Sequence, residues 1–248
     1  MVNLLLVSHS KKLVEGLAEM VQQMVSSKNV KIATAAGVGE NHQELGTNAM
    51  DILEKIEEIY SEDGILILMD LGSALLSTEM ALDLLHPEMR ANIKVCPAPF
   101  VEGSVSAGVQ ADLGADLETV YREAMQSLRA KNDQLAEEEL EPAVKESPCE
   151  AVPASEGDLR SVTLIVPNEQ GLHARPAVLF VKTVNNYDAT VRIKNLTKNK
   201  GPEGADSLIS VMLIAANKGD LVEINAEGPQ KDEVIAALED LFDRNFDE

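Results

Sequence analysis

Through the first half of the chain, short apolar runs alternate with longer stretches in which apolar residues recur every three or four positions. This alternation predicts strands and helices that follow one another in a parallel sheet. The expected strands are residues 3–8, 30–36, 64–70 and 93–99, and the expected helices are residues 13–25, 47–60, 73–85 and a last one from residue 116. The third strand is apolar from Ile65 to Met69, as a strand buried on both faces should be. The pattern predicts an α/β domain with an open, mostly parallel sheet.

Residues 159–248 show a different arrangement. Strands are expected at 161–167, 190–195 and 220–226, with a further short one around 197–201, and helices at 174–186, 207–217 and 231–242. This pattern is typical of an α+β open-faced sandwich, in which helices cover one side of a single sheet.

The segment 135–158 ("LAEEELEPAVKESPCEAVPASEGD") separates the two patterns and is rich in glutamate and proline. Because such a segment buries too little apolar surface to offset the entropy lost on ordering, we expect a flexible, extended linker. The predicted organisation is a domain at residues 1–134, a linker at 135–158 and a second domain at 159–248.

Composition restricts the classes of partner. The chain carries 21 basic and 42 acidic side chains, a net charge of −21, which argues against a nucleic-acid or anionic-membrane partner. Cys96 and Cys149 make no disulfide framework, and we find neither a signal peptide nor an apolar run long enough to span a membrane. We therefore expect a cytoplasmic protein.

His9 and Asp70 stand at the carboxyl ends of two predicted parallel strands, the edge at which open α/β sheets bind ligands. A carboxylate beside an imidazole fixes its tautomer and raises its basicity, which a phosphoryl-accepting nitrogen needs. Gly72 and Ser73 open the next helix, where free N–H groups can hold a phosphate. The alternative is a His–Asp pair that only caps these elements.

The motif "GLHARPA" places His173 where a helix begins, after a turn at Gly171, and puts Pro176 in the first helical turn, where its missing N–H costs little. The N–H groups of Ala174 and Arg175 then point at whatever the imidazole carries. The helix dipole favours an anion there, and the guanidinium can donate charge-assisted hydrogen bonds to it. This predicts a phosphohistidine. The alternative is a plain N-cap histidine with a solvated arginine.

The remaining histidines are interpreted as structural. His42 lies in a polar loop and is expected to face solvent, and His86, which precedes a proline, is expected to bind the carbonyl groups at a helix end. No two histidines are spaced as paired metal ligands, so no metal site is expected. The sequence contains neither a P-loop nor a dinucleotide fingerprint.

The motif "GLHARPA" and the later stretch "DSLISVMLIAANKGD" resemble HPr, the phosphocarrier of the sugar phosphotransferase system, across the whole second domain. The resemblance implies that His173 is phosphorylated on a ring nitrogen and that Arg175 stabilises the phosphoryl group. Ser207 falls at the regulatory serine of many HPr proteins. Asp206 precedes it, however, and Ser210 replaces the usual glycine.

The stretches "LVSHS" around His9, "MDLGSALLSTEMAL" around Asp70 and "APFVEGSVSAGVQA" at 98–111 resemble mannose-type enzyme IIA. They resemble more closely the phosphotransferase subunit of the phosphoenolpyruvate-dependent dihydroxyacetone kinase. The resemblance implies a second phosphorylation site at His9 and a homodimer through this domain. Some members carry a further enzyme I-like segment; this chain ends at Glu248 without one, which implies general enzyme I as the donor.

The two resemblances together imply a phosphotransferase of glycerol and dihydroxyacetone metabolism. Enzyme I, HPr or both would charge His173, which would charge His9, which would donate to ADP on a partner kinase subunit. The chain itself would bind no cofactor. Two alternatives remain: a mannose-class sugar-uptake enzyme IIA that donates to a IIB component, and a regulatory module whose phosphorylation only reports nutrient status.

Overall fold

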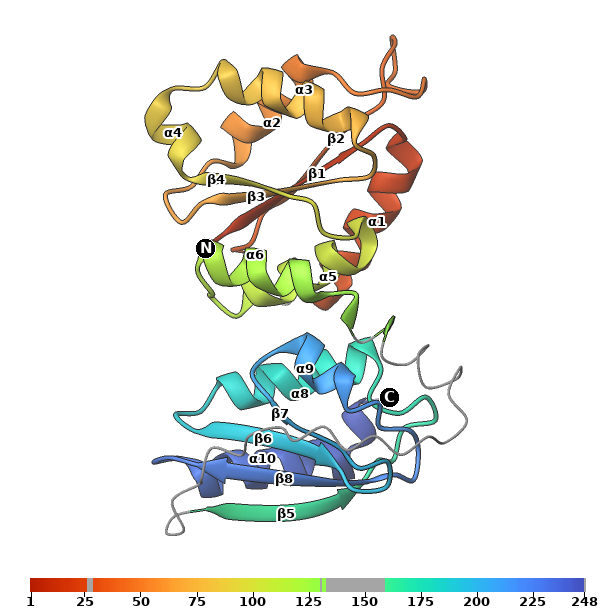
Figure 1. Ribbon diagram of the computed structural model, residues 1–248, viewed down its shortest axis with the longest axis vertical. Helices are drawn as coiled ribbons and strands as arrows, with labels where there is room; N and C mark the ends of the chain where they lie inside the picture. The colour runs from red at the N-terminus through yellow and green to blue at the C-terminus, as the bar shows by residue number, and fades with distance from the viewer. Residues whose placement is uncertain (26–28, 130, 133–158, 248) are drawn as a thin grey trace. The chain divides into compact units, whose positions relative to one another are not determined.

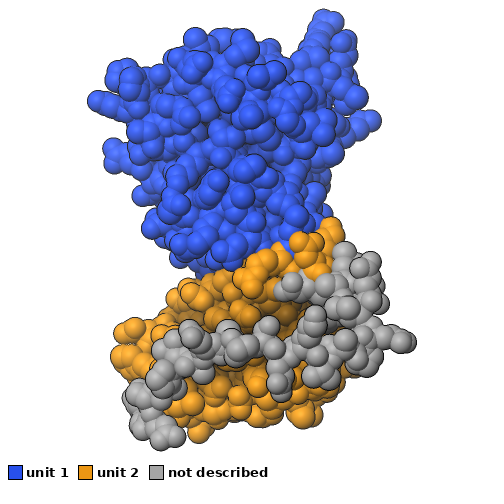
Figure 2. Space-filling view, viewed as in Figure 1, with its two compact units in different colours: residues 1–128 blue, residues 129–248 orange. Residues whose placement is uncertain are grey.

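The computed structural model describes residues 1–25, 29–129, 131–132 and 159–247. The chain divides into two compact units, residues 1–128 and 129–248 (Figure 2). The predicted linker and the predicted boundary at residue 134 lie outside the described residues, so the predicted domain limits stay predictions.

The first unit contains a parallel sheet in the strand order β2-β1-β3-β4. Its strands are β1 (Asn3–Ser8), β2 (Ile32–Ala36), β3 (Ile65–Met69) and β4 (Ile93–Cys96). The two central strands are neighbours, with Val7 opposite Met69 at their carboxyl ends. The chain leaves β1 toward one side of the sheet and β3 toward the other, so a crevice opens between these ends. The predicted parallel α/β sheet is confirmed.

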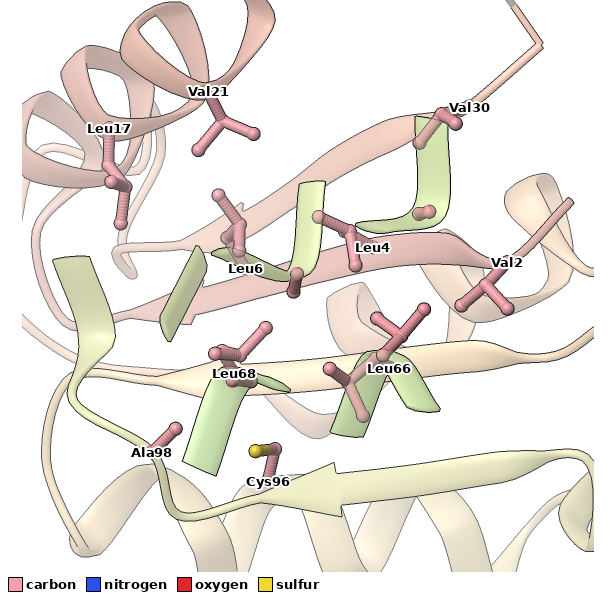
Figure 3. Packing of buried hydrophobic residues seen from close by; sticks show 14 of the residues in the cluster. Val2, Leu4, Leu6, Leu17, Val21, Val30, Leu66, Leu68, Cys96 and Ala98 are labelled. Atoms are coloured by element: carbon pink, nitrogen blue, oxygen red, sulfur yellow. The ribbon is translucent and has the colours of Figure 1, made fainter. Parts of the chain in front are cut away.

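Helices cover both faces of this sheet (Figure 1). They are α1 (Lys11–Met24), α2 (Ala49–Ile59), α3 (Ser73–Asp83), α4 (Pro87–Ala91), α5 (Phe100–Asp112) and α6 (Leu117–Gln126). Successive side chains of β1 point to opposite faces of the sheet. Leu4 and Leu6 pack against α1, α5 and α6 on one face. Leu5 and Val7 pack against α2 and α3 on the other. Figure 3 shows the first of these cores, which is aliphatic apart from the Cys96 thiol.

The hydrophobic pattern does not predict helix α5, because most of its buried residues are glycine, serine or alanine. A Cβ on Gly108 would lie 2.4 Å from Val21 Cγ1, and one on Gly103 would lie 2.8 Å from the Ala98 Cβ. Glycine and serine at such positions let α5 pack close to α1 and to the sheet. They also remove the three-and-four apolar spacing by which a helix is recognised.

The second unit contains an antiparallel sheet in the order β5-β8-β6-β7. Its elements are β5 (Arg160–Ile165), α8 (Ala174–Asn185), β6 (Thr190–Asn195), β7 (Lys200–Gly204), α9 (Leu208–Leu213), β8 (Leu221–Glu227), α10 (Lys231–Asp243) and the 3₁₀ turn η1 (Asn245–Asp247). Helices α8 and α10 pack together through Phe180 and Phe242, with ring centroids 6.3 Å apart. The predicted α+β class is confirmed.

Two predicted boundaries in this unit are wrong. The short strand predicted around 197–201 begins later and covers Lys200–Gly204. The helix predicted at 207–217 ends at Leu213, because Ala215 takes a positive φ of 45°, which no helix accommodates.

Cys96 is buried with a free thiol, and Cys149 lies outside the described residues. Within the described ranges, no helix is long and apolar enough to cross a bilayer.

Candidate functional site

His9 and Asp70 meet at the carboxyl ends of β1 and β3. His9 Nδ1 lies 2.9 Å from Asp70 Oδ1, and the His9 backbone N–H donates to Asp70 Oδ2 at 2.8 Å. The two side chains are 21% and 13% exposed. The imidazole is thus fixed by a carboxylate but still reachable from solvent.

Two further donors complete the shell of the carboxylate. Ser8 Oγ donates to Asp70 Oδ2 at 2.9 Å, and the Leu71 N–H donates to Asp70 Oδ1 at 2.7 Å. Burial raises the pKa of Asp70, but the hydrogen bonds from the backbone and ring of His9 and from Ser8 outweigh it and hold that pKa below its ordinary value of 3.8. Asp70 is therefore a carboxylate at neutral pH, and it accepts a hydrogen bond from the Nδ1–H group of His9.

The other ring nitrogen faces the start of α3. Ser73 Oγ lies 2.9 Å from His9 Nε2, and Gly72 is the N-cap of this helix. Among the described residues, the N–H groups of Gly72 and Ser73 donate no hydrogen bond. Free N–H groups at a helix N-terminus attract anions. A phosphoryl group on Nε2 would therefore lie close to donors at the start of α3.

An open hollow of about 590 Å³ begins at Asp70 and Gly72. Its walls are mainly apolar and include Leu71, Leu75 and Phe100. The hollow thus offers a mainly apolar surface next to Asp70, the residue that contacts the His9 ring.

His173 is the N-cap of α8 and has an extended backbone, with φ −75° and ψ −175°. Within the described part of the chain, the N–H groups of Ala174 and Arg175 donate no hydrogen bond. The Arg175 side chain is exposed, and Pro176 lies buried at the third helical position. The structure thus brings three of the predicted residues to one helix N-terminus.

Gly171 explains how the chain reaches this position. Its φ is +70°, and an added Cβ would lie 2.1 Å from the Ala216 carbonyl oxygen. The N–H of Leu172 donates to the same oxygen at 2.8 Å. Only glycine fits so close to this carbonyl in this conformation.

Ser207 is the N-cap of α9, and its hydroxyl accepts from the Ser210 N–H at 3.3 Å. Its regulatory role stays a prediction.

The structure leaves His42 exposed, as expected, and places His86 differently from expectation. His42, half exposed, lies with Nδ1 3.4 Å from Asp51 Oδ2. His86 is the N-cap of α4, and its carbonyl accepts from the Arg90 N–H at 3.0 Å, whereas α3 has already ended. Over the described residues, no cluster of three or more His, Cys, Asp or Glu side chains could hold a metal.

Sequence reasoning missed the role of Ser8. This serine is fully buried, and besides Asp70 it contacts the backbone of Ser10 through its hydroxyl. The only signal was a polar residue directly after the apolar run Leu4–Val7.

Comparison with known proteins gives the family. A family profile described as "PTS system fructose IIA component" matches residues 3–121, and one described as "PTS HPr component phosphorylation site" matches residues 160–244. "PEP-dependent dihydroxyacetone kinase 2, phosphoryl donor subunit DhaM" from Listeria innocua is 40% identical over 123 residues, which is 50% of this chain and 96% of the relative. The chain belongs to the DhaM family. The family prediction is confirmed, and the family is one of phosphotransferase subunits.

Two other relatives show how the match is distributed. DhaM from Escherichia coli K12 is 38% identical over 248 residues, covering 100% of this chain and 51% of the relative. "Phosphocarrier protein NPr" from the same organism is 37% identical over 87 residues, which is 35% of this chain and 93% of NPr. The chain therefore spans about half the length of the E. coli DhaM that it matches.

Proposed function

We propose that this chain relays phosphoryl groups on two histidines to a dihydroxyacetone kinase. Enzyme I, HPr or both pass a phosphoryl group from phosphoenolpyruvate to His173, which passes it to His9. His9 then donates to ADP held on a partner kinase subunit. The observation that carries the proposal is the orientation of His9, with Nδ1 on Asp70 and Nε2 beside Ser73 at a helix N-terminus.

The contacts of His9 support Nε2 as the reacting nitrogen. Asp70 accepts the Nδ1 proton, so the lone pair lies on Nε2. In the resting chain the Ser73 hydroxyl donates to this lone pair. When Nε2 carries a phosphoryl group, the hydroxyl and the N–H groups of the first turn of α3 become donors to its oxygens.

At His173 the groups offered to a phosphoryl group come from the backbone and from Arg175. The N-terminus of α8 supplies the N–H groups and the positive end of the helix dipole, and Arg175 supplies a guanidinium that can pair with two phosphoryl oxygens. Neither site needs a bound cofactor, because the phosphoryl group itself is the only group carried.

Each transfer is a displacement at phosphorus. The lone pair of the accepting nitrogen forms the new N–P bond as the bond from phosphorus to the donor nitrogen breaks, and the donor imidazole recovers its lone pair. In the last step an oxygen of the ADP β-phosphate forms the P–O bond and His9 Nε2 leaves. Donor and acceptor must approach in line, and the partly exposed His9 ring allows this.

We also propose the surroundings in which the relay works: the cytoplasm, with a homodimer formed through the first unit and a kinase subunit as acceptor. The relatives that match the whole chain bear the name of a dihydroxyacetone kinase donor subunit, which favours a kinase acceptor over a sugar-uptake component.

The test is mapping of alkali-stable phosphopeptides after incubation with phosphoenolpyruvate and enzyme I. Wild type, His173→Ala and His9→Ala are compared, each with and without HPr, and His42→Ala is the control. We expect label on both histidines in wild type. His173→Ala should lose label from His9 unless HPr is supplied, and His42→Ala should match wild type.

A second stage adds ADP and the kinase subunits, and label should then leave His9 for ATP. Label that reaches His173 but never His9 would contradict the relay and support a regulatory module.

A further inference from the structure

The loop that precedes His173 rests on a carbonyl group from a distant turn. The Leu172 N–H donates to Ala216 O at 2.8 Å, and Gly171 packs against the same oxygen so closely that no side chain fits between them. The position of His173 at the N-terminus of α8 therefore depends on where the Ala216 carbonyl lies.

The turn that carries Ala216 is not held by regular secondary structure. Helix α9 ends at Leu213, and Ala215 follows with φ +45°. A residue with a Cβ stays in this left-handed region only where neighbouring groups hold it there. The groups that hold the turn thus decide where Ala216 lies.

One carboxylate and one amide hold both flanks of Ala216. Asn195 Nδ2 donates to Ile214 O at 3.1 Å and to Asp220 Oδ2 at 2.9 Å. The same carboxylate oxygen accepts from the Asn217 N–H at 2.9 Å. The residues before and after the carbonyl are therefore tied to a single pair of side chains.

Lys198 adds a third link. Its Nζ donates to Ala215 O at 2.7 Å and lies 3.6 Å from Asp220 Oδ2, and its N–H donates to Asn195 Oδ1 at 3.1 Å. Asn195 is fully buried and Asp220 is 8% exposed. Burial raises the pKa of Asp220, but the hydrogen bonds from Asn217 and Asn195 and the nearby ammonium outweigh it and lower that pKa, so the group stays a carboxylate.

We propose that Asp220, together with Asn195, is a positioning residue for phosphorylation of His173. It fixes the turn at Ile214–Asn217, and the Ala216 carbonyl of that turn seats the Gly171–His173 loop. Asp220 acts through this carbonyl, not on the phosphoryl group. The inference rests on the proposed function, because it names a residue on which one step of the relay depends.

The test uses the full chain in a His9→Ala background, so that label stays on His173. Asp220→Ala should slow labelling from enzyme I and phosphoenolpyruvate by roughly 10- to 100-fold, since a misplacement of about 1 Å costs this much. The effect should fall on the maximal rate, with the KM for enzyme I little changed. Asp220→Asn keeps one acceptor oxygen, so its labelling rate should lie between those of Asp220→Ala and wild type.

Two controls separate positioning from loss of stability. Val234→Ala empties space at a fully buried position of α10 and lowers stability without touching the turn. Its labelling rate, measured well below the melting temperature, should equal that of wild type. Amide and imidazole NMR shifts of Leu172 and His173 in the unphosphorylated chain should move in Asp220→Ala and not in Val234→Ala.

A wild-type rate in Asp220→Ala, with unmoved shifts at Leu172 and His173, would overturn the inference. Equal slowing by Asp220→Ala and Val234→Ala would also overturn it. If wild type itself took no label on His173, the proposed function would fail at that step, and the NMR shifts would still decide whether Asp220 positions the loop.

Discussion

The substitution Asp70→Asn tests whether the carboxylate orients His9 for phosphoryl transfer. Each oxygen of Asp70 accepts two hydrogen bonds: Oδ1 from His9 Nδ1 and the Leu71 N–H, and Oδ2 from the His9 N–H and the Ser8 hydroxyl. An amide of the same shape keeps one acceptor oxygen and replaces the other with a donor. One pair of these contacts must therefore change.

Both orientations of the new amide leave one backbone N–H facing a donor. With its NH₂ at the Oδ1 position, the Leu71 N–H is unpaired and the imidazole must move its proton to Nε2, which then cannot attack phosphorus. With its NH₂ at the Oδ2 position, the His9 N–H is unpaired, although the Ser8 hydroxyl can turn to accept. An unpaired buried donor costs about 1–3 kcal/mol. The contact of the Leu71 N–H is exposed and that of the His9 N–H is partly buried, so we expect the free energy of unfolding of the first unit to fall by about 1 kcal/mol, the low end of that range.

The rate of phosphoryl transfer to His9 should also fall in Asp70→Asn, by more than the loss of folded protein would explain. Loss of the carboxylate that fixes a catalytic imidazole costs up to about 10⁴-fold in a serine protease triad. Because one amide orientation keeps the reactive tautomer of His9, we expect a smaller loss, roughly 10²-fold.

The assay is single-turnover transfer from phosphorylated HPr to His9 in a His173→Ala background. The matched control is Asp51→Asn, which alters the carboxylate beside His42. If Asp70→Asn transferred as fast as this control, the proposed orientation of His9 would be refuted.

Three further predictions follow from single contacts. Ser73→Ala removes the hydroxyl beside Nε2 but leaves Asp70 in place, so the same transfer should slow by roughly tenfold, with little change in melting temperature. Gly171→Ala should destabilise the second unit by more than about 2 kcal/mol in urea unfolding. Gly219→Ala, at φ +84° with no atom within 4 Å of its Cβ, should cost only about 1 kcal/mol, and equal losses would contradict the steric argument. The pKa of Asp70 is lower in the folded unit than its ordinary 3.8, so its contribution to stability is complete above that pH and is lost as the pH falls through the folded pKa; acid unfolding of Asp70→Asn should lack this component.

The sheet of the first unit could be predicted because β1 and β3 contain uninterrupted apolar runs, and β2 and β4 are apolar apart from Thr34 and Lys94. The order of the strands could not be read from the hydrophobic pattern. Open α/β sheets bind ligands at the carboxyl ends of their strands, however, and this rule needs only that β1 and β3 be parallel neighbours. Their pairing, with Val7 opposite Met69, brings His9 and Asp70 together. A prediction from two strand ends was therefore enough to find residues that are sixty-one positions apart in the chain.

The parts that could not be predicted depend on contacts between distant segments. Helix α5 is hidden because Gly103 and Gly108 serve close packing against Ala98 and Val21. The early end of α9 has no local signal, since the left-handed turn at Ala215 is held by side chains of other elements. Local periodicity reports the solvent-facing and core-facing sides of an element, not the contacts that end it.

The two candidate histidine sites solve the same chemical problem by different means. At His9 the ring is oriented by the side chains of Asp70 and Ser73. The rate of transfer should therefore fall more in Asp70→Asn than in Ser73→Ala. At His173 the Ala216 carbonyl from a distant turn holds the backbone before the helix N-terminus, so sensitive positions should include Gly171 and the groups that hold Ala216. Substitutions at the first site should therefore slow transfer at residues that contact the His9 ring, and substitutions beneath the second should slow it by roughly 10- to 100-fold at positions that never touch the phosphoryl group.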